Sequence, residues 1–104
     1  MDANQKDNLK QTTLYYASRD GKNKVCQFLI NQDLNVNDID VYGQNPIYYA
    51  VAYGNMETCK FLQRNGSFHD YVDENGETPL YYTIKHNRET IAEWLITLGC
   101  NLNI

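Results

Sequence analysis

The hydrophobic and polar residues of this chain follow a helical rhythm that breaks off at regular intervals. Pairs such as Leu80 and Thr83 stand three residues apart and share one face of a helix of about two turns. A longer amphipathic stripe follows, in which Ile91, Leu95 and Leu98 lie at helical spacing. Helices this short are marginal when isolated in water. The pattern therefore predicts pairs of helices that depend on packing against one another.

The helix pairs belong to a unit that is written three times. One hexapeptide recurs every 33 residues, as Thr-Thr-Leu-Tyr-Tyr-Ala at 12–17, Asn-Pro-Ile-Tyr-Tyr-Ala at 45–50 and Thr-Pro-Leu-Tyr-Tyr-Thr at 78–83. A fixed period of about 20–50 residues predicts a solenoid, in which small units stack to bury a shared core. The function of such a stack normally lies on a surface that several repeats share.

Residues with special backbone preferences mark the ends of the predicted helices. Thr78 is a good N-cap, and Pro79 suits the first helical position. Gly21, Gly54 and Asn87 follow the first helix of each copy, where a left-handed residue often ends a helix. The second helices are predicted at about residues 22–32, 55–65 and 88–98, and hairpin loops at 36–43 and 69–76.

A period of 33 residues around a Thr-Pro-Leu-x-x-Ala core resembles the ankyrin repeat. The resemblance covers about residues 7–104 and implies an all-α ankyrin-repeat solenoid of helix-turn-helix units joined by hairpin loops. We expect one domain over residues 1–104, with repeats at about 7–39, 40–72 and 73–104 after a polar tail at 1–6. Tyrosine replaces the usual histidine of the family in all three copies. The threonine–histidine hydrogen bond that ties the loops of the family is therefore missing.

Composition narrows the function further. The net charge is −4 and the chain has no basic run, which argues against direct binding of nucleic acid. No apolar run approaches the about 18–20 residues that cross a membrane. The N-terminal residues lack the apolar stretch of a secretory signal, so we expect an intracellular protein, either cytoplasmic or nuclear.

No constellation of residues in the sequence predicts catalysis or metal binding. His69 and His86 are the two histidines, and they occupy different positions in the repeat. Cys26 and Cys59 occupy one position in successive repeats, where the third copy has Ala92. This pattern favours small buried residues over a disulfide or a metal pair. We expect no enzyme activity, cofactor or metal.

The resemblance implies a binding surface, because ankyrin stacks usually bind protein through their hairpin tips and the exposed side of their first helices. The positions of this chain on that concave face are Gln11, Tyr16, Arg19 and Asp20 in the first repeat, Tyr42, Gln44, Tyr49 and Tyr53 in the second, and Glu74, Glu77, Tyr82, Lys85 and His86 in the third. The predicted function is a non-catalytic module that binds a protein or peptide partner.

The tyrosines allow two interpretations. The first tyrosine of each hexapeptide is expected to fill the gap between adjacent first helices. The second tyrosine also recurs, so it could form a structural ladder or contact a partner. Tyr42 and Tyr53 do not recur, and the repeat itself does not require them. Since tyrosine is enriched in interface hot spots, these two are the better functional candidates.

Two further functions stay open. Glu74 and Glu77 stand near the aromatic face, and the acidic balance favours a basic partner through electrostatic steering. Some ankyrin domains are similar in reading histone tails, so a basic or methyl-lysine peptide is one alternative. The other is an architectural or oligomerisation segment of a larger protein.

The last repeat is unusually apolar. Its apolar residues are Ile91, Trp94, Leu95, Ile96, Leu98, Leu102 and Ile104. Trp94 aligns with Phe28 and Phe61, and we expect all three to be core residues. The remaining apolar positions suggest a surface that expects a neighbour, either through self-association or through further domains at this end.

Overall fold

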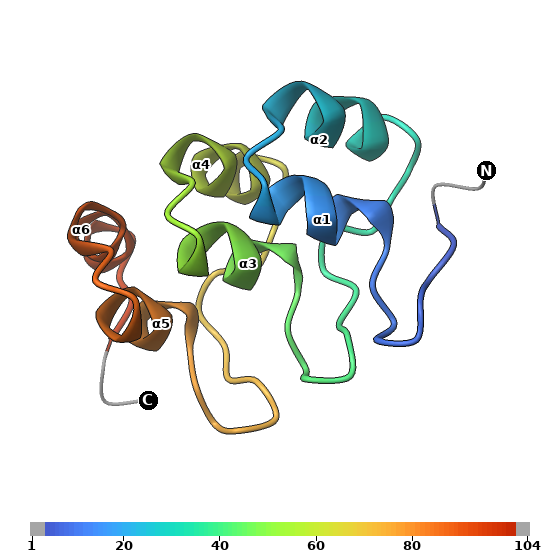
Figure 1. Cartoon of the computed structure of the whole chain (residues 1–104). Helices are drawn as coiled ribbons and strands as arrows, with labels where there is room; N and C mark the ends of the chain where they lie inside the picture. Colours follow the sequence, from blue (N-terminus) through green and yellow to red (C-terminus); the bar gives the residue numbers. More distant parts are fainter. Residues whose placement is uncertain (1–3, 102–104) are drawn as a thin grey trace.

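Three pairs of helices lie side by side in this computed structural model, which describes residues 4–101. The first helices are α1 (Thr13–Arg19), α3 (Pro46–Ala52) and α5 (Pro79–Lys85), and the second helices are α2 (Asn23–Ile30), α4 (Met56–Arg64) and α6 (Glu89–Thr97). Figure 1 shows the first helices in one row and the second helices in another, with the loops between repeats extending to one side. The described residues hold helices and loops but no strand, as an all-α solenoid requires.

The residues predicted to begin or end the first helices do so. The Tyr81 amide donates to the Thr78 hydroxyl at 3.2 Å, so Thr78 caps α5. Gly54 follows α3 with a φ of 76°, and Asn87 follows α5 with a φ of 59°. Each second helix starts one residue later and ends one or two residues earlier than the periodicity predicts.

The core runs through all three pairs. Leu14, Ile47 and Leu80, one from each first helix, are at most 1% exposed. Ile91 and Leu95 are buried as predicted, but Leu98 is 37% exposed. The prediction for Leu98 is wrong because this residue is the C-cap of α6, where the helical stripe ends.

A buried tyrosine ties each of the two later hairpins to the preceding repeat. The Tyr15 hydroxyl donates to the carbonyl oxygens of Asp38 and Gln44, at 2.5 and 3.0 Å, on the two legs of the second hairpin. Tyr48 does the same for the third hairpin, which it meets at the Tyr71 and Glu77 carbonyls, 2.6 and 2.9 Å away. This contact replaces the missing threonine–histidine bond.

Tyr81, the aligned tyrosine of the third repeat, is not buried as Tyr15 and Tyr48 are. We predicted that it fills a gap between first helices, as Tyr15 and Tyr48 do, but its side chain is 42% exposed. The prediction fails because the described residues place no further hairpin beyond α5 to cover it. Its neighbour Ile84 is exposed for the same reason, whereas Val51 at the equivalent position of α3 is fully buried.

The expected core position of Phe28 is also wrong. Phe28 is 63% exposed, whereas its counterparts Phe61 and Trp94 are partly buried against the core. A helix pair precedes the second and third repeats in the stack, but none precedes the first among the described residues. Val25, on the same face of α2, is exposed for the same reason.

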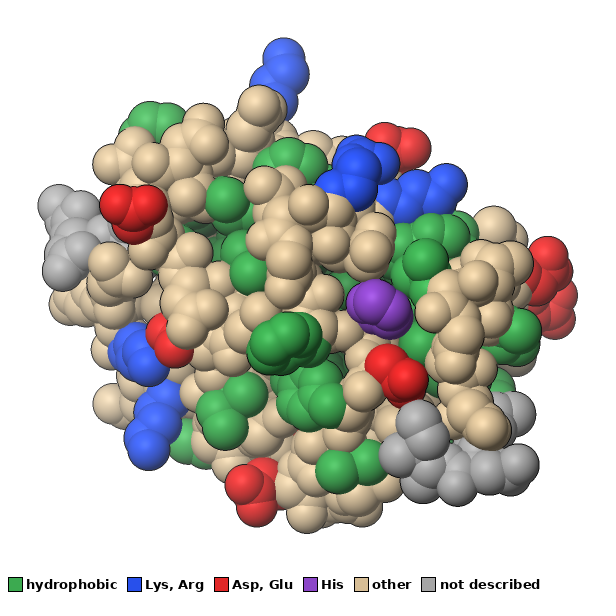
Figure 2. Space-filling model, turned by 180° about the vertical axis from the view of Figure 1, so that it is seen from behind, with side chains coloured by type: hydrophobic (Ala, Val, Ile, Leu, Met, Phe, Trp, Pro, Cys, Tyr) green, Lys and Arg blue, Asp and Glu red, His purple; other side chains and the backbone are tan. Residues whose placement is uncertain are grey.

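Other hydrophobic side chains reach the surface in the last repeat. Ile96 is 55% exposed, while Leu102 and Ile104 lie outside the described residues. On the face turned away from the viewer of Figure 1, hydrophobic side chains are scattered among polar ones (Figure 2). Within residues 4–101, no helix has the length and apolar character that a membrane span needs.

Candidate functional site

The hairpins of the second and third repeats are built around buried aspartates. One carboxylate oxygen of Asp40 accepts the backbone amides of Tyr42 and Gln44, both at 3.0 Å. Asp73 accepts the amides of Asn75 and Glu77 in the same way, both at 2.9 Å. The other oxygen of each carboxylate therefore faces the neighbouring repeat and is available for contacts across the junction.

A glutamine from the preceding repeat reaches this second oxygen. Gln11 Nε2 lies 2.9 Å from Asp40 Oδ2 and 2.9 Å from the Tyr49 hydroxyl. The Tyr49 hydroxyl also donates to Asp40. These three side chains join the first two repeats, and we call this arrangement the Gln–Asp–Tyr ladder.

The second junction repeats the arrangement. Gln44 Nε2 donates to Asp73 Oδ2 at 2.7 Å and to the Tyr82 hydroxyl at 3.0 Å. Tyr82 lies 3.0 Å from Asp73 and 2.9 Å from Glu77, which holds the glutamine position of the third repeat. The hydroxyls of Tyr49 and Tyr82 are thus used within the chain, as a structural ladder requires.

The ladder shifts the proton equilibria of its members. Burial alone would raise the pKa of Asp73, but hydrogen bonds from Gln44, Tyr82 and backbone amides outweigh it and hold that pKa below its ordinary value. Burial and the hydrogen bonds to Glu77 and Asp73 raise the pKa of Tyr82. At the second junction, Asp73 is therefore ionised and Tyr82 is neutral at neutral pH.

A groove lies on the concave side between the second and third repeats. It has a volume of about 480 Å³, and we call it the central groove. Its lining includes six predicted site residues, namely Tyr42, Gln44, Tyr49, Tyr53, Tyr82 and His86. Its exposed members are Tyr42, Tyr53 and His86, and the two tyrosines are 48% and 57% exposed.

The other predicted site residues lie outside the lining of the groove. Tyr16 and Arg19 are at the α1 end, where the Arg19 guanidinium lies 5.2 Å from the centre of the Tyr16 ring. Glu74 is exposed on the third hairpin, and its amide donates to the Tyr42 carbonyl at 3.0 Å. Lys85 places its ammonium group 5.5 Å from the centre of the Tyr82 ring.

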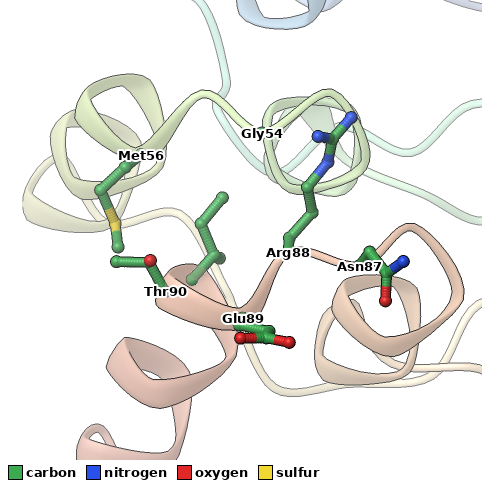
Figure 3. Close-up of a pocket in the computed structure, with 7 residues that line it drawn as sticks. Gly54, Met56, Asn87, Arg88, Glu89 and Thr90 are labelled. Carbon is green, nitrogen blue, oxygen red and sulfur yellow. The ribbon is translucent and has the colours of Figure 1, made fainter.

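Three residues of the groove were not predicted as site residues, Tyr48, Ala52 and Arg88, and Arg88 is the charged one. Its Nε donates to the Ala52 carbonyl at the end of α3, at 3.1 Å. Asn55 holds the same position one repeat earlier and donates to the Arg19 carbonyl at 2.7 Å. The change from Asn55 to Arg88 in aligned repeats was the signal in the sequence. Figure 3 shows Arg88 reaching toward the turn at Gly54, while Glu89 points away.

The described residues offer no cluster of histidine, cysteine and carboxylate side chains that could hold a metal ion. Cys26, Cys59 and Cys100 are free and buried. Burial raises the pKa of the Cys59 thiol to about 12. Such a thiol stays protonated at neutral pH. Cys26 and Cys59 are core residues, as the sequence predicted.

Comparison with known proteins agrees with this geometry. A family model described as ankyrin repeats (3 copies) matches residues 1–73 and 43–104. The search of curated proteins gave no significant match. The two overlapping matches span the whole length of the sequence and agree with the three observed helix pairs. The chain therefore belongs to the ankyrin-repeat family.

Proposed function

We propose that this chain is a non-catalytic binding module that holds an extended segment of a partner protein in its central groove. Ankyrin repeats are generally protein–protein interaction modules and are typically non-catalytic. The groove is the part of the concave face that gathers most of the predicted site residues.

One observation carries the proposal, the exposure of two aromatic residues that the repeat does not need. Tyr42 and Tyr53 are 48% and 57% exposed on the same groove, and neither takes part in the Gln–Asp–Tyr ladder. Their counterparts in the other repeats are not tyrosine: Leu9 and Asn75 for Tyr42, and Asp20 and His86 for Tyr53. Exposed tyrosines offer a large contact area at low cost in side-chain entropy, which is typical of binding surfaces.

The walls of the groove are already fixed in the free protein. The rings of Tyr48 and Tyr82 meet edge to face at 5.6 Å, and those of Tyr15 and Tyr49 do so at 5.6 Å. The hydroxyls of Tyr49 and Tyr82 are held by the ladder. A partner therefore meets a preformed surface, which reduces the entropy lost on binding.

Selection from a phage-displayed library of random linear peptides tests the proposal. We expect selected peptides to lose about tenfold or more in affinity for Tyr53→Ala or Tyr42→Ala, since each removes a central aromatic contact of about 1.4 kcal/mol or more. Phe28→Ala is the matched control, because Phe28 is equally exposed but lies on α2, outside the groove. Selected peptides that bind both tyrosine variants as tightly as the wild type would overturn the proposal.

A reader of basic or methyl-lysine peptides, such as histone tails, receives less support. Two of the tyrosine faces that could hold a cation already hold Arg19 and Lys85 of this chain. Glu77, one of the two carboxylates expected to attract a basic side chain, accepts a hydrogen bond from Tyr82. The same peptide selection decides between these functions by the charge of the peptides it yields.

An architectural role rests on a different observation, the open side of α5. Tyr81 and Ile84 are 42% and 56% exposed there, although their counterparts are buried under a following repeat. Self-association through this side predicts that Ile84→Glu shifts a dimer toward monomer in sedimentation. A wild-type chain that stays monomeric at high concentration would count against it.

Location inside the cell, in cytoplasm or nucleus, is part of the proposal and is testable by fractionation.

A further inference from the structure

We propose that the central groove selects an acidic side chain, an Asp or Glu of an extended peptide segment, whose carboxylate binds the Arg88 guanidinium. This inference rests on the proposed function, because it names the chemistry of the partner for the same groove. It opposes the expectation from net charge, which is −4 for the whole chain and favours a basic partner.

Charge on the concave face is divided between two rims. The rim at the ends of the first helices carries Lys85 and Arg88, with His86 between them, in the third repeat, and the ion pair of Arg19 with Asp20 in the first. The acidic residues Glu74 and Glu77 belong to the rim at the hairpin tips, and neither lines the groove. None of the described residues that line the groove is Asp or Glu.

The two buried carboxylates, those of Asp40 and Asp73, do not make the surface of the groove acidic. Asp40 and Asp73 lie behind the tyrosines, where they accept hydrogen bonds from Tyr49 and Tyr82 and from the two ladder glutamines. Their exposed fractions are 4% and 7%. A ligand in the groove therefore meets tyrosine, histidine and arginine side chains.

Arg88 has donors to spare. A guanidinium carries five N–H donors, and the Ala52 carbonyl takes the one on Nε. The two ion pairs within residues 4–101 are Lys6 with Asp38 and Arg19 with Asp20, so Arg88 is in neither. Its terminal nitrogens can bind both oxygens of one carboxylate, which is the geometry that guanidinium groups favour.

The surroundings hold the guanidinium in place for such a contact. Gly54 has no side chain, and a Cβ there would lie only 3.1 Å from the guanidinium carbon. Arg88 borders both the central groove and a second cavity of about 390 Å³ beside the start of α6. Figure 3 shows the nearest carboxylate of that cavity, Glu89, pointing away from the guanidinium. The positive charge thus stays available to a ligand.

Asn55, the residue aligned with Arg88 one repeat earlier, shows which part of the role of Arg88 does not need a positive charge. Asn55 holds the previous helix end with an amide alone, through bonds of 3.0 and 2.7 Å to the Ser18 and Arg19 carbonyls. An arginine is not needed for this contact between repeats. Arg88→Asn should therefore keep the junction while it removes the charge, and it is the variant of choice.

The test uses those peptides from the random library whose binding is weakened by Tyr42→Ala or Tyr53→Ala. We expect these peptides to share an Asp or Glu. Exchanging that residue for Asn or Gln in a resynthesised peptide should weaken binding about tenfold or more, the worth of a hydrogen bond to a charged group. Arg88→Asn should cause the same loss for the acidic peptide and little further loss for the neutral one. Glu89→Gln is the control, with wild-type affinity expected.

Three results would overturn the inference. Groove-dependent peptides without an acidic residue, or with unchanged affinity for Arg88→Asn, would remove the acidic selectivity and leave the proposed function standing. Groove-dependent peptides rich in Lys or Arg that need Glu74 would reverse it. If no selected peptide depends on Tyr42 or Tyr53, the proposed function fails and the inference fails with it. Thermal melting of Arg88→Asn, expected within a few degrees of the wild type, guards against misfolding, and the exchange within the peptide needs no protein variant.

Discussion

Tyr48 and Tyr81 occupy the same position in successive repeats but have opposite surroundings. Tyr48 is 2% exposed, holds two carbonyl oxygens of the next hairpin, and packs edge to face on Tyr71 at 5.3 Å. Tyr81 is 42% exposed and meets Tyr82 at 5.7 Å. The comparison teaches that this tyrosine contributes to stability through the hairpin that covers it, and not through its own helix.

The same contrast extends to the rest of the junction. Val51 is fully buried between repeats, whereas Ile84, its counterpart in α5, is 56% exposed. At the other end of the described stack, Phe28 is exposed where Phe61 is partly buried. At each junction, the side of one repeat that faces the next repeat is covered by it. Within the described residues, the first repeat has an uncovered outer side at Phe28, and the third repeat has an uncovered outer side at Ile84.

Truncation of Tyr48 and of Tyr81 to alanine, in separate variants, should give the largest difference in stability. Tyr48→Ala leaves a cavity and removes the hydroxyl that donates to the Tyr71 carbonyl, so we expect a loss of about 3–5 kcal/mol in the free energy of unfolding. Tyr81→Ala should cost less than about 1 kcal/mol, as is usual for exposed positions. Urea denaturation followed by circular dichroism measures both. Equal losses would show that the column stabilises each helix locally.

Leu80→Ala tests whether the inner side of the last repeat is as tightly packed as the inner sides of the other repeats. Leu80 is 1% exposed, and Leu80→Ala should cost about 2–5 kcal/mol. Ile84→Ala on the open side of the same helix is the control, with a loss below about 1 kcal/mol expected. A loss well under 1 kcal/mol at Leu80 would mean that this helix face is placed wrongly.

A smaller change separates the hydroxyl from the ring. Tyr48→Phe keeps the packing but leaves the Tyr71 carbonyl without its donor, while the Glu77 carbonyl keeps the Asp73 amide, so a loss of about 1–3 kcal/mol is expected. Tyr81→Phe should be close to neutral. Chemical denaturation of both variants at one pH gives the two values, and a neutral Tyr48→Phe would show that water can replace the hydroxyl.

The ladder predicts a dependence on pH at the second junction. Hydrogen bonds hold the pKa of Asp73 below its unfolded value of about 3.9, so its stabilising contribution is complete above that value. This contribution is lost as the pH falls through the folded pKa. Unfolding free energies of wild type and Asp73→Asn should differ by a constant amount at neutral pH and converge below about pH 4. Asp70→Asn, at an exposed carboxylate outside the ladder, is the control.

The smallest expected effect concerns the thiols. Burial raises the pKa of Cys59 to about 12, and burial together with Asp70 raises that of Cys100 to about 11. At pH 8 a thiol reagent should therefore label Cys100 of the last repeat before Cys59 of the second repeat. Mass spectrometry of timed samples gives the order. Equal labelling rates would show that the two sites open together.

The repeat period made most of the fold predictable. Thr78, Gly54 and Asn87 mark helix ends through local backbone chemistry that needs no knowledge of neighbours. The exposure of Phe28 and Tyr81 was not predictable in this way. Alignment assigns one environment to every copy of a position, whereas burial in a stack depends on which repeats lie on either side.

The lining of the central groove was predictable in part. The sequence singled out Tyr42 and Tyr53 because they break the repeat, and the structure places both on one groove. It did not reveal that the recurring aspartates, glutamines and tyrosines form a ladder, since the partners are 29 or 38 residues apart. Arg88 escaped notice because its reach across the junction depends on the missing side chain of Gly54.

The ladder also limits how the repeats can be rearranged. Gln11 and Gln44 each offer an amide N–H to the aspartate of the repeat that follows. Glu77 holds their position in the third repeat but has no proton to donate when ionised. If the third repeat were moved to an inner place by duplication or shuffling, Glu77 would face an aspartate as a like charge. The order of these units is thus specified by a single amide group, and modular exchange within this stack would require residue 77 to change with it.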